Sequence, residues 1–124
     1  MSKKIVEIVQ DGSYRAGQPA QLSIHDGDTV EFKNGDSGGT TLVLTGETRR
    51  VLSPIPASTT IEIAAGSSAS FEVKGVSQAT YCCQVLSEGT APMPINCESA
   101  GAGAILSVLS SETRSTDNRT GRGL

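Results

Sequence analysis

Hydrophobic and polar residues alternate in short runs along most of this chain. The alternation is clearest at 21–25, 29–33 and 70–74, where every second residue is apolar. Because successive side chains of a β-strand point to opposite faces, this pattern is typical of strands with one buried face. Less regular runs of the same kind occur at 4–10, 41–44, 59–64, 79–85 and 104–109. The pattern therefore predicts about eight short strands.

Turn-forming residues separate most of these runs. Asp26-Gly27-Asp28, the stretch 34–39 and Gly66-Ser67-Ser68 are rich in the Gly, Asp, Asn and Ser that turns require. No stretch repeats apolar residues at the spacing of an amphipathic helix. Residues 46–58, which include two prolines, are long enough to cross from one sheet to the other. We therefore predict an all-β protein, an antiparallel Greek-key β-sandwich.

The chain length and the polarity of its C-terminal end indicate one domain followed by a tail. The 124 residues suffice for one domain. Residues 111–124 contain two acidic and three basic side chains and have no apolar residue before Leu124. Such a segment has little to bury and does not order itself. We predict a domain over 1–110 and a flexible polar tail over 111–124.

Composition and charge exclude several classes of partner. The net charge is −3 and aromatic residues make up 3%, without tryptophan. A protein that follows a nucleic-acid backbone needs a basic surface, and single-strand binding also needs aromatic side chains for stacking. No apolar run approaches the 18 or so residues that a membrane-spanning helix requires. We expect no nucleic-acid partner and no membrane span.

The N-terminal sequence and the cysteine count leave the compartment open. The first residues are basic, but Glu7 interrupts the apolar stretch after Ile5 and Val6, so no signal-peptide core follows. The expected location is cytoplasmic if the chain is full length and extracytoplasmic if a signal peptide has been removed. Three cysteines leave at least one thiol unpaired within the chain, which fits a reducing compartment slightly better.

The residue inventory does not favour an enzyme. His25 is the single histidine, and no Gly-x-Ser-x-Gly sequence is present to expose a nucleophilic serine. Asp26 and Asp28 flank a glycine, an arrangement found more often in hairpin turns than in acid–base pairs. We therefore predict no catalytic residues, a turn role for the two aspartates, and a surface or turn position for His25.

The order of strands and turns over about residues 20–110 resembles the cupredoxin family, the fold of plastocyanin-like and azurin-like copper proteins. The similarity to that family lies in Asp26–Asn34, Thr40–Leu44, Ile61–Val73, Thr80–Cys83 and Gly101–Val108. In the Thr80–Cys83 segment, the resemblance places Cys83 where the family has its copper thiolate. The resemblance implies a Greek-key sandwich with its binding loops at one end.

The copper ligands of that family are missing. Thr40 or Thr41 stands where the first copper-binding histidine is expected, and no histidine follows Cys83. A blue-copper site needs two imidazoles, one thiolate and a weak axial ligand, for which Met93 is the nearest candidate. The cysteines and His25 are zinc-ligand types, but neighbouring strand residues face opposite ways and spoil a tetrahedral set. We expect no metal site and no cofactor.

The three cysteines carry the remaining chemistry. Alternation places Cys83 on the core face with Tyr81 and Cys82 on the opposite face. A buried thiol, a disulfide and, less readily, a redox or metal ligand all remain open for Cys83. Under oxidising conditions we predict a Cys83–Cys97 disulfide, which would close the loop that copper holds in the family, and a free thiol at Cys82.

Two functions follow from these observations. The first is a copper-free cupredoxin-like binding or assembly module, which binds a protein partner or associates with itself, for example as a subunit of a larger homomeric structure. Loops and sheet edges of a rigid sandwich are where such a module would make its contacts. The alternative is a thiol-based redox or metal-handling protein that uses Cys82, Cys83 and Cys97.

Overall fold

A computed structural model gives the arrangement of the chain. It describes residues 2–11, 14–87, 90, 95, 97 and 103–110, with the backbone alone at Asp11 and Tyr14. The predicted tail over 111–124 lies outside these residues, as does Met93.

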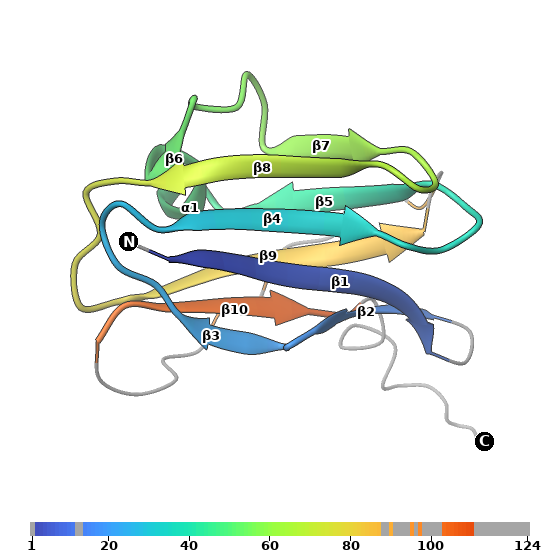
Figure 1. Cartoon of the computed structure of the whole chain (residues 1–124), viewed down its shortest axis with the longest axis horizontal. Coiled ribbons are helices and arrows are strands. Elements are labelled where there is room, and N and C mark those ends of the chain that lie inside the picture. Colours follow the sequence, from blue (N-terminus) through green and yellow to red (C-terminus); the bar gives the residue numbers. More distant parts are fainter. Residues whose placement is uncertain are drawn as a thin grey trace.

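Two five-stranded sheets face each other, so the all-β prediction is confirmed (Figure 1). Sheet A has the order β2-β1-β4-β8-β6, and sheet B has the order β3-β10-β9-β5-β7. The strands are β1 (Lys3–Asp11), β2 (Tyr14–Gln18), β3 (Gln21–Ser23), β4 (Thr29–Asn34), β5 (Thr40–Leu44), β6 (Leu52–Ser53), β7 (Thr60–Ile63), β8 (Ser68–Val73), β9 (Thr80–Ser87) and β10 (Ile105–Leu109).

Both sheets are mixed, which corrects the prediction of an antiparallel sandwich. β1 runs parallel to β4, and β9 runs parallel to β10, whereas the other neighbours are antiparallel. Parallel neighbours need a crossover rather than a tight turn. Between β1 and β4 the chain passes through sheet B at β3, and between β9 and β10 it has a connection of 17 residues, 88–104.

The core lies between the sheets and is built by the predicted alternation. Val30 and Phe32 of β4 are fully buried, and Tyr81, Cys83 and Val85 of β9 face them from the other sheet as members of the same core cluster. At about 25 cal/mol per Å² of buried apolar surface, this shared cluster is the main stabilising contribution to the fold. The two sheets therefore share one core.

The segment between β5 and β7 contains a short helix that the sequence pattern did not predict. Helix α1 (Gly46–Arg50) begins after Thr45, whose side chain accepts a hydrogen bond from the Thr48 backbone amide. The buried Thr48 hydroxyl donates to the Cys82 carbonyl, 2.9 Å away, which fixes the helix against β9. A helix of five residues is shorter than any repeat that hydrophobic periodicity can detect.

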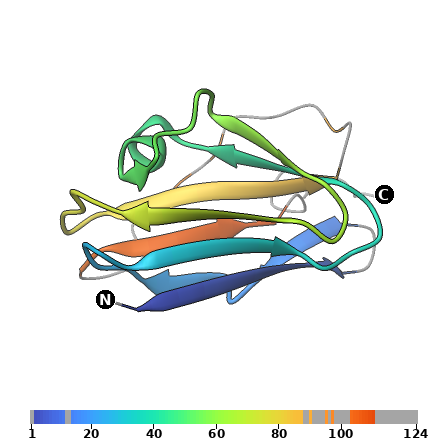
Figure 2. The same ribbon diagram turned by 45° about the horizontal axis from the view of Figure 1, so that its top comes forward.

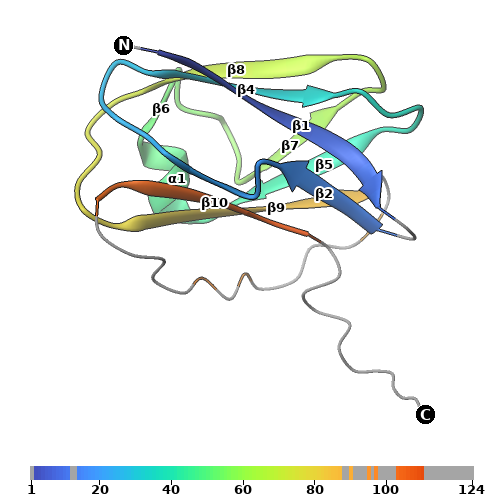
Figure 3. The same ribbon diagram turned by 60° about the horizontal axis from the view of Figure 1, so that its bottom comes forward.

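The two long sides of the sandwich differ. On one side β2, which pairs with β1 along its whole length, also contacts β9 and β10, so that this edge of sheet A lies against sheet B (Figure 3). On the other side β7 and β8 run along the two sheet edges, joined by the turn at 64–67, while α1 and β6 cover the opposite half (Figure 2). The second side is therefore the more open one.

Candidate functional site

The two adjacent cysteines of β9 lie on opposite faces of sheet B. Cys83 faces the core, as its alternation with Tyr81 predicted, and is fully buried. Cys82 faces outward and forms a disulfide with Cys97. The predicted Cys83–Cys97 disulfide and the predicted free thiol at Cys82 are therefore wrong, because Cys83 is the free cysteine.

This pairing error arose from the position of Cys97 and not from the facing of the strand. The prediction paired Cys97 with the cysteine on the core face of the strand. In the structure Cys97 is exposed, with its Sγ 3.8 Å from the carbonyl oxygen of Thr80, on the outside of β9. Gln84 and Leu86, which share the outer face with Cys82, are also buried. β9 is thus covered on both faces.

The environment of Cys83 suppresses thiol chemistry. Burial raises the pKa of the Cys83 thiol to about 12, so it remains protonated at neutral pH. The thiolate, not the thiol, is the nucleophile and the metal ligand. Cys83 is also separated from the Cys82–Cys97 disulfide by the strand itself. The three sulfur atoms therefore do not share one site, and no group of three metal-ligating side chains occurs in the part of the chain described.

The residues considered as copper ligands on the basis of the sequence resemblance do not meet. Cys83 is opposite Leu44 in the β5–β9 ladder, whereas Thr40 is opposite Ser87. Four residues along a strand span about 13 Å. The side chain of His25 is 74% exposed and lies in the turn before β4, which confirms its predicted surface or turn position. Cys83, Thr40 and His25 therefore cannot form one coordination sphere.

Asp26 and Asp28 hold the turn between β3 and β4, as predicted. Asp28 accepts hydrogen bonds from the amides of Ser2 and His25, each at 3.0 Å. Asp26 accepts one from the amide of Val76. Burial alone would raise the pKa of Asp28, but these amide hydrogen bonds and the Lys4 ammonium outweigh it, so the pKa lies below its ordinary value. Both carboxylates therefore accept hydrogen bonds from backbone amides, which is a structural role.

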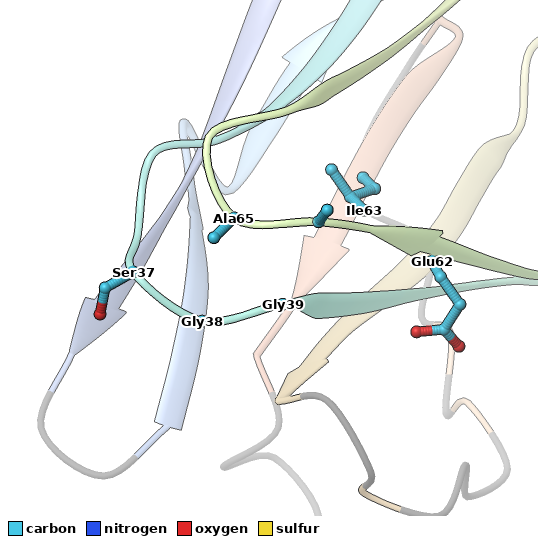
Figure 4. Close-up of a pocket in the computed structure, with 7 residues that line it drawn as sticks. Ser37, Gly38, Gly39, Glu62, Ile63 and Ala65 are labelled. Atoms are coloured by element: carbon cyan, nitrogen blue, oxygen red, sulfur yellow. The ribbon is translucent and has the colours of Figure 1, made fainter.

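A shallow pocket of about 400 Å³ lies where β5 and β7 separate at the loop end of the sandwich (Figure 4). One wall is the β4–β5 loop and the other is the end of β7 with its turn to β8. Most of the lining is small, and Glu62 is its one charged residue. The lining residues are Ser37, Gly38, Gly39, Glu62, Ile63, Ala64 and Ala65. Among the residues that the structure describes, no long side chain other than Glu62 and Ile63 lines the pocket.

β7 is the edge strand of sheet B beside this pocket. The Leu44 amide donates to the Thr59 carbonyl, which makes these two residues a hydrogen-bonded pair. Because such pairs alternate in an antiparallel ladder, the main-chain groups of Thr60 and Glu62 point away from β5. The Thr60 amide bonds to the Ser58 hydroxyl at 3.1 Å. The amide and carbonyl of Glu62 face the open edge.

The neighbouring edge of sheet A is also open. β6 pairs with β8 at Glu72 and Val73, so no strand of the described part of the chain lies beyond 68–71 of β8. Ile61 of β7 and Ala69 and Phe71 of β8 pack against the core but are only partly buried. We call this strip, from β7 across to residues 68–71 of β8, the β7–β8 seam. It combines open backbone edges with partly exposed apolar side chains.

A partly buried ion pair supports the loop that forms one pocket wall. Arg15 of β2 contacts Asp36 of the β4–β5 loop, and the Arg15 side chain is 7% exposed. Gly38 allows this approach, because a Cβ atom there would lie 2.8 Å from the Arg15 guanidinium. The pair neutralises Asp36 and leaves Glu62 as the net charge of the pocket. Sequence reasoning missed both the pair and the seam, because strand order and contacts between distant segments leave no local pattern.

Comparisons with family models, curated proteins and solved structures gave no match to this chain. Within the described residues, no helix is long and apolar enough to cross a membrane.

Proposed function

We propose that this chain is a copper-free, cupredoxin-like binding module that accepts an extended segment of a partner protein along β7. The observation that carries the proposal is the open edge at Glu62, whose amide and carbonyl point away from β5. An added strand would continue the ladder of sheet B and cover the seam. The Greek-key connectivity and the relation to cupredoxins are part of this proposal and rest on the sequence resemblance.

Strand addition fits the two kinds of contact that the seam offers. Main-chain hydrogen bonds supply affinity in such complexes, and side chains at alternate positions supply specificity. Ile61, Ala69 and Phe71 would lose their remaining exposure to water under an added strand. The short β3 and β6 edges, of three and two residues, offer less backbone than β7.

Glu62 favours a different partner segment over a second β7. If two copies paired antiparallel through β7 and centred on this residue, the two Glu62 carboxylates would lie directly opposite each other. Like charges in directly opposed positions destabilise a strand pair. A homomeric assembly through another segment of the chain remains compatible with the open edge. We therefore propose a heterotypic strand as the occupant.

The thiol-based alternative has less support. Cys83 is buried and protonated, and the remaining two cysteines are joined to each other. A redox or metal-handling protein needs at least one accessible thiolate or a cluster of ligands. Strand addition at the open edge of β7 requires neither an accessible thiolate nor a cluster of metal ligands.

Photo-crosslinking from the edge tests the proposal. A benzophenone amino acid is placed at Thr60 in the full chain, and at Lys33 as a matched position on an exposed part of β4. Crosslinked partners from the source cell are identified by mass spectrometry, purified and tested for direct binding. We expect a partner that crosslinks from position 60 and not from 33, and that loses binding to E62P, which lacks the outward amide. Equal crosslinking from both positions, or full binding of E62P, would overturn the proposal.

A further inference from the structure

We infer that the segment bound along β7 carries an arginine or lysine, whose side chain enters the pocket at the end of the strand. This inference rests on the proposed strand addition and names the chemistry of the bound segment. It begins from Glu62, which belongs both to the open edge and to the pocket wall.

The charge of the pocket requires a cationic occupant. No lysine, arginine or histidine of the described part of the chain lies within ion-pair distance of Glu62, whose side chain accepts a hydrogen bond from the Thr41 hydroxyl at 2.9 Å. Asp36, the nearest acidic residue in the adjoining loop, is already paired with Arg15. A carboxylate next to an open pocket pairs best with a guanidinium or an ammonium group.

The shape of the pocket requires a long side chain. Gly38 and Gly39 line one wall and Ala64 and Ala65 the other, so about 400 Å³ lies open between two stretches of small residues. Figure 4 shows Glu62 at one end of this lining and Ser37 at the other, with the two glycines between them. The aliphatic stem of arginine or lysine can pack on these small residues while its charged end reaches the Glu62 carboxylate.

The position of the pocket agrees with strand addition. A strand added beside β7 alternates its side chains between the two faces of sheet B. Those on the outer face lie on the same side as the Glu62 side chain, which contacts Thr41 across the ladder. One residue of the added strand therefore lies next to Glu62 without any change of backbone direction.

The test uses three peptides and three variants of the full chain. The probes are acetylated and amidated Thr-Val-Arg-Val-Thr, and the same peptide with glutamine or glutamate in place of arginine. Binding to the ¹⁵N-labelled chain is followed by NMR titration at low salt. We expect the arginine peptide to shift the amides of 60–63 and of Gly38 and Gly39, and to bind at least tenfold more tightly than the glutamate peptide.

The variants separate this inference from the proposed function. E62Q keeps the outward amide and removes the charge, so it should lose the preference for arginine. E72Q, which alters an exposed carboxylate of β8 outside the pocket, should keep it. If the glutamine peptide binds as tightly as the arginine peptide, or if E62Q behaves like the unmodified chain, the cationic occupant is wrong while strand addition stands.

Strand addition has its own readout in the same experiment. E62P should bind none of the peptides, and if it fails to fold, hydrogen exchange at the Glu62 amide replaces it. That amide should become protected when the arginine peptide binds. Peptide binding without protection of this amide, or no binding of any peptide at millimolar concentration, would overturn both the inference and the strand addition on which it rests.

Discussion

Gly17 of β2 lies directly against Val108 of β10, so that a Cβ atom at position 17 would stand 2.6 Å from the Val108 Cγ1 atom. These residues belong to different sheets, and their contact is where β2 closes one side of the sandwich. Replacing Gly17 by alanine forces β2 away from β10 or strains the Val108 side chain.

We expect Gly17→Ala to lower the free energy of unfolding by about 1–3 kcal/mol, the usual cost of overpacking. Urea unfolding measures this change in the free energy of unfolding. Gly46→Ala is the control, because a Cβ atom there meets nothing within 4 Å. Adding Val108→Ala should recover part of the loss in the double variant, since it removes the clashing methyl groups. A Gly17→Ala protein as stable as the Gly46→Ala protein would contradict the close contact.

Asp28→Asn tests the turn that joins β3, β4 and the start of β1. An amide side chain keeps one acceptor oxygen but loses the charge that strengthens the bonds from Ser2 and His25. We expect a loss of about 1–3 kcal/mol in unfolding free energy at pH 7. Asp26→Asn, which alters a single exposed hydrogen bond to Val76, should cost less.

The same carboxylate makes stability depend on pH in the acidic range. The pKa of Asp28 in the folded chain lies below its ordinary value of 3.8, so the ionised group stabilises the fold above that pH. The contribution is lost as the pH falls from 3.8 through the lower folded-state value. The difference between the unmodified chain and Asp28→Asn should therefore be constant from pH 7 to about pH 5 and shrink below about pH 4. A difference that grows on acidification would show the opposite shift.

The cysteine assignment can be checked by labelling. In the oxidised native chain, iodoacetamide at pH 8 should modify no cysteine, because Cys82 and Cys97 are bonded and Cys83 is a buried thiol with a pKa raised to about 12. Unfolding without reductant should expose Cys83 alone. We expect Cys97→Ser to lower the unfolding free energy by about 3 kcal/mol, as for a disulfide that closes a loop of this length. Label on Cys82 after unfolding would restore the pairing first predicted.

Thr40→Val should stabilise the protein. Thr40 is fully buried, and its hydroxyl has no hydrogen-bond partner among the residues whose structure is described. Valine has nearly the same shape and removes the cost of burying an unpaired hydroxyl, so we expect a gain of about 1 kcal/mol in thermal or urea unfolding. Thr41→Val is the contrasting variant, because the Thr41 hydroxyl bonds to Glu62. A loss on Thr40→Val would mean that the hydroxyl has a partner.

Sequence patterns predicted the facing of side chains and missed the pairing of distant segments. Alternation placed Val30 and Phe32 in the core and Cys83 on the core side of its strand, because period two is a local property of the backbone. The parallel pairing of β1 with β4 depends on contacts between segments about 25 residues apart in sequence. Whether Cys97 approaches β9 from inside or outside is likewise decided by the path of the chain.

In the candidate site, too, local features were predicted and the pairing of distant segments was not. The turn rich in Asn and Gly after β4 and the strand that became β7 were both expected from composition and alternation. That β7 lies at the edge, next to that turn, follows from the order of strands in sheet B, which no single run of residues specifies. The sequence pattern therefore does not distinguish Glu62 from any other polar residue on a half-buried strand.

The place of β10 in sheet B determines when β3 can pair during synthesis of the chain. β3 is joined to its sheet only through β10, which lies between β3 and β9 and is formed by residues 105–109. Until those residues have been synthesised, β3 has no strand beside it, whereas β5, β7 and β9 of the same sheet come earlier in the chain and can already pair. β3 therefore joins its sheet only after β10 has been synthesised, and its backbone edges stay open until then.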